Sequence, residues 1–476
     1  MRTGLPARCS PSTAASEVNE RVLAHLQSNH DRILAELVEL AAIPSVSTDP
    51  AHAADMLAAA RWVETKLASA GPVAVHTIAT PGNPVVYGEW LGAPGKLTVL
   101  VYGHYDVQPA DPLEKWQSPP FTPTLRDGRL YARGVSDDKG PMLIPIKVAE
   151  AFFAVTGDLP VNVKFMFEGE EEIGSRHLET FIEQHKELLA ADVVLSADGA
   201  MWRIDEPSLT VSSRGLAGLE LTLTGAGKDL HSGRHGGGVA NPLHAMARLI
   251  ATLHDDSGRI AIDGFYESVP ELSAGERAAI AALPFDERAY LAQIGAPAVF
   301  GERDYTTLER QWTRPTIEVN GMWGGYEGPG QKTVIPSEAH AKITCRLVPD
   351  QDPDHVIALV TRHLEAHVPP GTRLSITKAD HGARPAHIDA DHFALRAADT
   401  ALQAVYGVRP LIVRMGGTVP ISELFQRHMG LDTVFFSFST ADEDYHAPNE
   451  FFRVHRLHEG LEAWARYWEL LGELRP

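Results

Sequence analysis

Several short segments contain the His, Asp and Glu residues that commonly bind divalent metal ions. GHYDVQP places His104 and Asp106 two residues apart, ARGVSDDKGP contains Asp137, and EGEEEIGS places four glutamates within residues 168–172. Residues two apart in an extended chain point to the same side, so Asp106 can orient the His104 imidazole. Each motif alone also fits a structural role, such as a capped loop, a helix N-cap or a solvated charged turn.

Further candidates complete a set of nitrogen and oxygen donors that contains no cysteine. Asp198 ends DVVLSAD, and His446 lies in DEDYHAPNE. Two histidines and several carboxylates suit Zn²⁺, Mn²⁺ or Co²⁺. Two ions sharing a bridging carboxylate and a bridging water would use these residues economically. Adjacent Glu171 and Glu172 could then divide the work, one as a metal ligand and the other as a general base.

Each of these motifs lies at or near the end of a short, apolar, β-rich segment or the start of a helical one. The β-rich segments are Leu97–Asp106, Val161–Glu172, Asp192–Asp198 and Thr433–His446. Helical patterns occupy Asp31–Ile43, Ala53–Gly71, Lys139–Val155 and Arg176–Leu189. Apolar strands alternating with helices predict an α/β fold with a mostly parallel sheet, whose ligands bind at the carboxyl ends of the strands.

The middle of the chain has a different pattern. Alternating, half-exposed strands are predicted near Leu209–Ala217, Ala339–Leu347 and Arg373–Lys378, with a helix at Asn241–Asp256 between them. This pattern predicts an inserted α+β domain. We therefore expect a flexible leader at 1–16, a catalytic domain formed by 17–213 and 386–476, and a lid or dimerisation domain at 214–385.

Composition excludes several classes of partner. The 476 residues include 42 Lys and Arg and 62 Asp and Glu, which gives a formal net charge of −20. A field of that sign disfavours nucleic acid and anionic membrane surfaces. The two cysteines, Cys9 and Cys345, imply no disulfide framework. With no apolar run long enough to span a membrane and no secretory signal pattern at the N-terminus, we expect a cytoplasmic protein.

The order of eight motifs resembles a known enzyme family. GHYDVQP, SDDKGP, EGEEEIGS, SADG, KDLHSG, RLVP, MGGTVP and YHAPNE are similar to motifs of the dinuclear-zinc exopeptidases in the aminoacylase and carboxypeptidase-G superfamily. The similarity is greatest to the carnosinase-type, or cytosolic nonspecific, dipeptidases and spans about Asp31–Trp468. It implies a catalytic α/β domain interrupted by a lid that also forms the homodimer.

The resemblance also assigns a role to each site residue. It implies that His104 and Asp198 bind one metal, Glu172 and His446 bind the other, and Asp137 bridges them. Glu171 becomes the general base and Asp106 orients His104. His231, which otherwise reads as one more structural or exposed histidine, becomes an oxyanion donor that reaches the partner subunit's site. The substrate's C-terminus would be bound by Arg346, Thr333, Thr418 and the backbone at Gly417.

These assignments predict a metal-dependent dipeptidase that acts on small peptides with a free C-terminus. A metal-bridging water would attack the peptide bond with Glu171 as general base, at two divalent ions that are Zn²⁺ or, alternatively, Mn²⁺ or Co²⁺. The long lid segment Asp263–Thr316 favours this reading over an N-acyl- or N-carbamoyl-amino-acid amidohydrolase. A catalytically silent metal-binding dimer is a third reading, which Glu171 argues against because a pure binding site needs no base.

Overall fold

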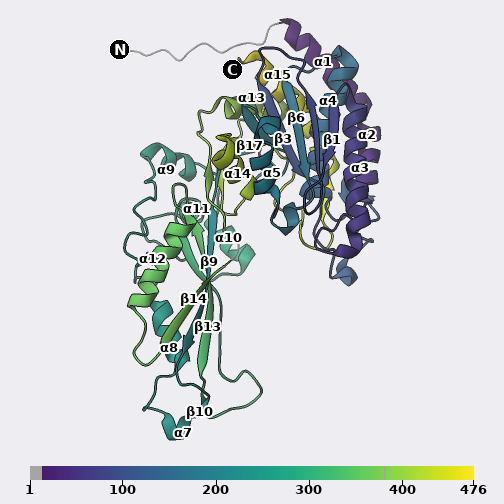
Figure 1. Ribbon diagram of the computed structural model, residues 1–476. Coiled ribbons are helices and arrows are strands. Elements are labelled where there is room, and N and C mark those ends of the chain that lie inside the picture. The colour runs from purple at the N-terminus through teal and green to yellow at the C-terminus, as the bar shows by residue number, and fades with distance from the viewer. Residues whose placement is uncertain (1–12, 380–381, 476) are drawn as a thin grey trace, which may run out of the picture. The chain divides into compact units, whose positions relative to one another are not determined.

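The computed structural model describes residues 13–379 and 382–475 (Figure 1). Cys9 and most of the predicted leader lie outside the described residues. Helix α1 begins at Thr13, within the range that was predicted as leader. None of the described helices has the length and apolar character needed to cross a lipid bilayer.

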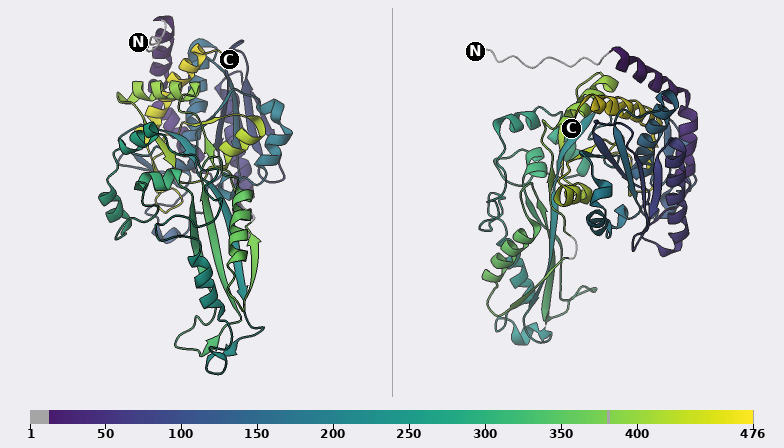
Figure 2. Two further views of the ribbon diagram at one scale, coloured as in Figure 1. Left: turned by 90° about the vertical axis from the view of Figure 1, so that its left-hand side faces the viewer. Right: turned by 45° about the horizontal axis from the view of Figure 1, so that its top comes forward.

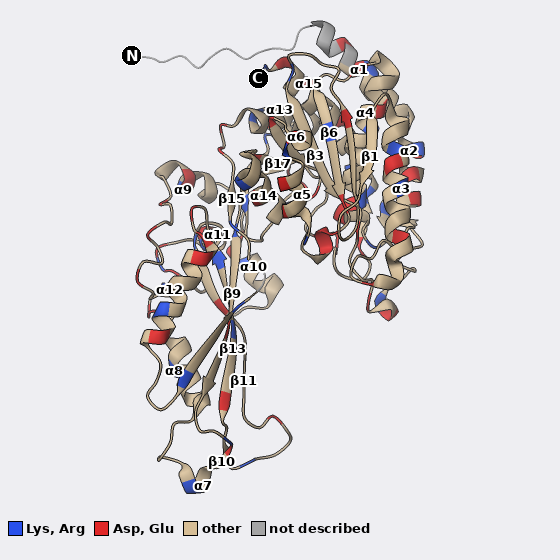
Figure 3. Ribbon diagram, viewed as in Figure 1, with Lys and Arg blue, Asp and Glu red and all other residues tan. Residues whose placement is uncertain are grey.

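The described chain folds into two compact units. The first contains the chain up to Thr210, Ile388–Ile412 and the chain from Leu424 onward. The second contains Val211–His387 and Val413–Glu423. Acidic residues are spread over both units (Figure 3). Each unit has its own sheet and its own apolar core, so the two are described separately.

The first unit contains a six-stranded sheet in the order β1-β2-β6-β3-β7-β17. Its four strands β6, β3, β7 and β17 run parallel, whereas β2 is antiparallel to both of its neighbours. The strands are β1 (Ala74–Ile78), β2 (Val85–Trp90), β3 (Thr98–His104), β6 (Asn162–Glu168), β7 (Val193–Ser196) and β17 (Thr433–Phe435). The predicted mostly parallel α/β sheet is therefore confirmed.

Helices surround this sheet, and the purple α2 and α3 are stacked beside it in Figure 2. The helices of the unit are α1 (Thr13–Ser28), α2 (His30–Ala41), α3 (Ala53–Ala70), α4 (Gly140–Thr156), α5 (Leu178–Gln184), α6 (Lys186–Leu189), α13 (Phe393–Tyr406) and α15 (Val454–Glu473). Helix α4 is apolar nearly all round because it packs against α1, α3 and α15. Trp464 and Trp468 of α15 are fully buried, so the final helix completes the core.

Two further sheets are built from short strands, some of whose residues belong to the second unit. A three-stranded sheet has the order β18-β5-β4, and another has the order β15-β8-β16. These strands are β4 (Thr124–Arg126), β5 (Arg129–Tyr131), β8 (Ser208–Ser213), β15 (Ala386–His387), β16 (Leu411–Met415) and β18 (Phe451–Arg453). Short helical turns lie at η1 (Pro50–His52), η2 (Leu113–Lys115), η3 (Val135–Lys139) and η4 (Glu171–Ile173).

The second unit is built on a four-stranded antiparallel sheet in the order β11-β13-β9-β14. The strands are β9 (Gly215–Thr224), β11 (Thr316–Trp323), β13 (Glu338–Leu347) and β14 (Arg373–Lys378), with a small ladder of β10 (Leu230–His231) and β12 (Val334–Ile335). The helices are α7 (Ser232–His235), α8 (Pro242–Ala251), α9 (Ala274–Ala281), α10 (Glu287–Ile294), α11 (Thr307–Thr313) and α12 (Pro353–Ala366). Alternate residues of β9 and β13, including the buried Cys345, form an apolar core with α8 and α12.

The second unit also includes Val413–Glu423, which the sequence pattern placed in the C-terminal catalytic segment 386–476. The reason is a set of long-range hydrogen bonds. The backbone amide of Arg214 donates to the Gly417 carbonyl at 2.9 Å, and its Nε donates to the Gly416 carbonyl at 2.9 Å. The predicted boundary therefore misses a short segment that returns to the second unit. Helix α14 (Pro420–Met429) then leads back into the first unit.

Candidate metal centre

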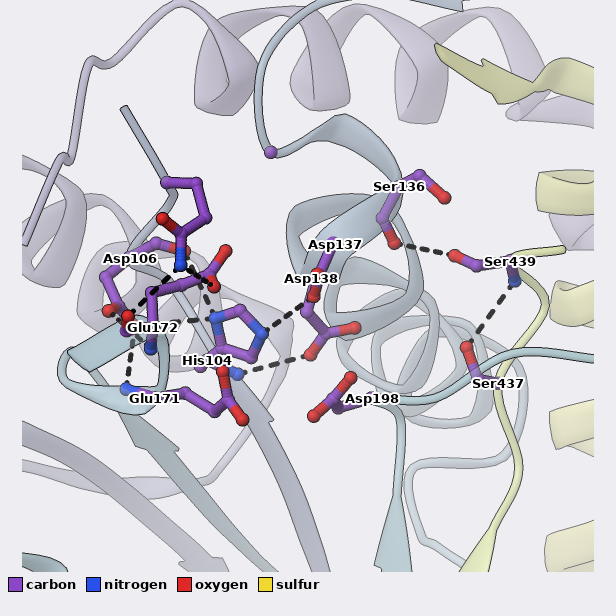
Figure 4. Close-up of polar contacts among 12 residues, drawn as sticks. His104, Asp106, Ser136, Asp137, Asp138, Glu171, Glu172, Asp198, Ser437 and Ser439 are labelled. Carbon is purple, nitrogen blue, oxygen red and sulfur yellow. Dashed lines mark hydrogen bonds and ion pairs between the residues drawn. The ribbon is translucent and has the colours of Figure 1, made fainter. Parts of the chain in front are cut away.

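Three groups of three potential metal ligands lie in the described part of the first unit, and two of these groups share a residue. One consists of His104, Asp137 and Asp198, and the other of Asp137, Glu172 and His446. Within each group the ligand atoms all lie within 4.8 Å of one another. Asp137 belongs to both groups, so the two sets of donors share one carboxylate. Figure 4 shows several of these side chains pointing toward one another.

The parallel sheet explains how distant residues meet here. His104 is the last residue of β3 and pairs with Glu168 at the end of β6. Asp198 follows β7 by two residues, and His446 lies in the long loop after β17. Because these four parallel strands end at the same edge, the polar residues that follow them converge. Asp137 comes from η3, the turn that leads into α4.

The two oxygens of Asp137 face two different imidazoles. Its Oδ1 lies 3.1 Å from Nε2 of His104, and its Oδ2 lies 3.0 Å from Nε2 of His446. The same Nε2 of His446 is 3.1 Å from Oε2 of Glu172. A carboxylate that offers one oxygen to each group of donors has the arrangement needed to bridge two cations. The residues present therefore fit a dinuclear metal site.

Asp106 contacts both His104 and the turn that carries the neighbouring glutamates. Its Oδ1 lies 3.4 Å from Nδ1 of His104, and its backbone oxygen lies 3.1 Å from the same nitrogen. Its two carboxylate oxygens accept hydrogen bonds from the amides of Glu171 at 3.2 Å and Glu172 at 3.1 Å. One buried carboxylate thus orients the imidazole and also holds η4. The second contact was not predicted from the sequence.

The four glutamates of EGEEEIGS have different partners. Glu168 accepts hydrogen bonds from the Tyr102 and Ser175 hydroxyls, at 2.7 and 2.9 Å. Glu170 is buried and contacts Nδ1 of His177 at 2.8 Å and the Asn83 amide at 3.3 Å. Both of these glutamates therefore stabilise the surrounding loops.

Glu172 is part of one of the two ligand groups, and Glu171 lies next to it in the chain. Glu172 lies against His446 and accepts a 2.8 Å hydrogen bond from the Gln108 amide. The Glu171 carboxylate has no hydrogen-bond partner among residues 13–379 and 382–475, and its side chain extends toward Asp198 (Figure 4). Of the four glutamates, Glu171 is thus the one whose carboxylate is available to a substrate or a water.

Electrostatics at the site favour added positive charge. Burial, together with repulsion from Asp137 and Glu172, raises the pKa of Asp198 to about 6. Burial and repulsion from Asp198, Asp137 and Glu172 also hold the pKa of Glu171 well above its usual range, although nearby His104 opposes this. Hydrogen bonds to Asp137 and Glu172 raise the pKa of His446 to about 10. Clustered buried carboxylates of this kind are relieved by bound cations.

The family model described as peptidase family M20/M25/M40 matches residues 100–470, which include all five residues of the two groups and Glu171. The chain belongs to this family. It is 31% identical over 474 residues to human Beta-Ala-His dipeptidase, with 96% of this chain and 93% of that protein covered. It is 30% identical to the Cys-Gly metallodipeptidase dug1 of Schizosaccharomyces pombe, with 95% and 98% covered.

A solved structure of another M20 enzyme is also similar. The metallo-carboxypeptidase Sso-CP2 from Sulfolobus solfataricus is 33% identical and has a TM-score of 0.81. The alignment covers 93% of this chain and 99% of that one. The resemblance to carnosinase-type dipeptidases inferred from the sequence motifs is therefore confirmed, together with the α/β fold class.

The other predicted site residues of this M20 chain lie in the second unit, in two groups. In the first, Nη1 of Arg346 donates to the Thr418 hydroxyl at 3.0 Å, next to Gly417. In the second, exposed His231 lies on β10 and accepts a 3.0 Å hydrogen bond from the Gly233 amide at Nδ1. The Thr333 carbonyl accepts from the Ser232 amide beside it, at 3.0 Å.

Sequence reasoning missed Arg214, which lies beside Arg346. Arg346 pairs with Leu216 across β13 and β9, so residue 214 falls on the same face of the sheet two positions away. Burial and the positive charge of Arg346 lower the pKa of Arg214 to about 10. Neither arginine has a carboxylate within 4.0 Å among the residues that the structure describes. The strand register would have revealed this pair only once β9 and β13 had been aligned.

Proposed function

We propose that this protein is a metal-dependent dipeptidase that hydrolyses small peptides with a free C-terminus. The observation that carries the proposal is the pair of ligand groups sharing Asp137, with the available carboxylate of Glu171 beside them. Membership of the M20 family and similarity to two named dipeptidases support the same activity. Family membership also favours a hydrolase over a catalytically silent metal-binding dimer.

In the proposed mechanism, His104 and Asp198 would hold one divalent ion, Glu172 and His446 would hold the other, and Asp137 would contribute to both ligand groups. When bound, the two ions would lower the pKa of the attacking water and polarise the scissile carbonyl. Glu171 takes the proton from the water at its carboxylate and delivers it to the leaving amine nitrogen. Its raised proton affinity suits a group that must both take up and release a proton.

The donor set supports Zn²⁺, with Mn²⁺ and Co²⁺ as alternatives, because imidazole and carboxylate ligands suit all three. Metal analysis of the purified protein will identify the ion. We also propose a cytoplasmic homodimer formed through the second unit, with His231 acting at the partner subunit's site. Edge strand β11 supports such an interface, because Val319, Met322 and Trp323 on it are exposed. Analytical ultracentrifugation at micromolar concentration tests the dimer.

A substrate panel tests the activity. We expect free dipeptides to be hydrolysed, and chelation to abolish turnover until Zn²⁺ or Mn²⁺ is restored. The panel should include N-acyl and N-carbamoyl amino acids, because cleavage of these alone would establish the amidohydrolase alternative. It should also include tripeptides, because similarity to a metallo-carboxypeptidase favours a second candidate activity, removal of the last residue from longer peptides. Activity that survives complete metal removal would contradict the proposed mechanism.

We further propose that Arg346, Thr418, Thr333 and the Gly417 backbone bind the substrate carboxylate. Two neighbouring guanidinium groups without a carboxylate partner among the described residues support an anion site at Arg346. We therefore expect Arg346→Lys to raise KM for free dipeptides by about 10-fold or more, because a lysine cannot make the bidentate contact. The KM for C-amidated dipeptides should change little. An equal rise in KM for free and C-amidated dipeptides would show instead that Arg346 has a structural role.

A further inference from the structure

Glu450 is a buried carboxylate that belongs to neither ligand group. Its Oε2 accepts hydrogen bonds from Nη1 of Arg133 and from the amide of Gly134, both at 2.8 Å. Its Oε1 accepts from the amide of Ser136 at 2.9 Å and from the amide of Asp137 at 3.2 Å. The residue is only 1% exposed. All four donors lie in the segment that ends at the shared ligand Asp137.

Strand pairing explains why Glu450 reaches this segment. Phe451 of β18 pairs with Tyr131 of β5, and the Ala132 amide donates to the Glu450 carbonyl at 3.2 Å. Glu450 therefore lies just past the end of the ladder, where the strand paired with β18 leads from β5 into η3. At that point backbone amides face the carboxylate and have no strand to pair with.

The same loop also carries His446. The loop is closed by a hydrogen bond from the Phe451 amide to the Glu443 carbonyl, at 3.1 Å. Asp444, His446 and Asn449 all have positive φ values, of 53°, 62° and 69°. Asp, His and Asn adopt positive φ more readily than other non-glycine residues, so the residue types of this loop suit its conformation.

The N-terminal end of this loop also contacts the segment that precedes Asp137. Glu443 is fully buried and accepts a 2.6 Å hydrogen bond from the Ser136 hydroxyl. The loop is therefore joined to the segment before Asp137 at both of its ends, through Glu443 on one side of His446 and Glu450 on the other. The ligands His446 and Asp137 are positioned by one connected structure.

We propose that Glu450 is a positioning residue that fixes Asp137 relative to His446 and so assembles the second ligand group, Asp137, Glu172 and His446. This inference rests on the proposed dinuclear centre but not on any particular substrate. A glutamine at 450 has one acceptor oxygen and a donor NH₂, so it would face two of the four N–H donors with another donor. Those donors would lose their partner, and the segment that carries Asp137 would shift.

The test is a metal titration of Glu450→Gln by dialysis against buffered Zn²⁺, with metal measured per folded molecule. Loss of a partner that orients metal ligands typically costs 10- to 100-fold in affinity. We expect about a 10- to 100-fold loss for one of the two ions and a smaller loss for the other. The absorption spectrum of bound Co²⁺ should also differ between Glu450→Gln and the wild type. Glu450→Asp, which keeps the charge but shortens the reach, provides a second variant if Glu450→Gln does not fold.

Glu302→Gln is the matched control, because Glu302 is also buried and bound by an arginine. Its carboxylate accepts two 2.9 Å hydrogen bonds from Arg314 in the second unit. This variant should lose stability but keep both ions. If Glu450→Gln or Glu450→Asp lowers the unfolding temperature yet binds both ions as tightly as the wild type, the positioning role is overturned. If the wild type itself does not bind two ions, the dinuclear centre fails as well.

Discussion

Glu171→Gln should lower kcat by about 10²- to 10⁴-fold, the usual contribution of a general acid–base group. The amide keeps the size of the side chain but cannot take a proton from the attacking water. We expect the metal content and KM to stay close to the wild-type values, because Glu171 belongs to neither ligand group. Steady-state kinetics on a free dipeptide, with metal analysis of the same sample, measure all three quantities.

Glu170→Gln provides a control on the adjacent residue. The Glu170 carboxylate is occupied by His177 and Asn83, so its substitution should affect loop stability and leave kcat within a few-fold of the wild type. The proposed role of Glu171 fails if both variants lose the same amount of activity. It also fails if Glu171→Gln retains wild-type turnover with both ions bound.

Asp137→Asn should reduce binding of both ions, whereas His446→Gln should reduce binding of only one. The reason is that Asp137 is the only residue shared by the two ligand groups in the described part of the chain. An asparagine has one oxygen and one NH₂, so it can offer a metal ligand to at most one side. We expect about 10³-fold or greater loss of kcat/KM in Asp137→Asn, since charge stabilisation by both ions is affected.

Metal titration distinguishes these two variants most directly. Asp137→Asn should bind both ions more weakly than the wild type does. His446→Gln should bind one of the two ions with an affinity near that of the wild type. If the two variants lose the same single ion, Asp137 does not bridge. Asp205→Asn, on an exposed aspartate outside both groups, controls for the loss of one negative charge.

The strand-end residues of the metal centre could be predicted because their signals are local. Each of β3, β6 and β7 is a short apolar run, and His104, Asp198 and the four glutamates lie at the end of such a run or directly after it. A parallel sheet brings those ends together whatever the details of the loops. The fold class followed from the same alternation of apolar strands and helices.

Residues whose roles depend on distant contacts could not be predicted. Nothing in the letters EGEEE separates Glu170 from Glu171, because the difference lies in partners such as His177 and Asn83. Glu450 acts through the pairing of β18 with β5, and Arg214 through the register of β9 and β13. The return of Val413–Glu423 to the second unit is likewise a long-range effect, since it depends on bonds to Arg214.

The discontinuous first unit has a consequence for the order of events during synthesis. His104, Asp137 and Asp198 leave the ribosome before the second unit is made, but His446 and helix α15 emerge only after it. Domains generally fold as units once their sequence is available. Because α15 supplies Trp464 and Trp468 to the core, a nascent chain lacks both the last metal ligand and a stable core. The ligand group that contains His446 therefore cannot be completed until the second unit has been made.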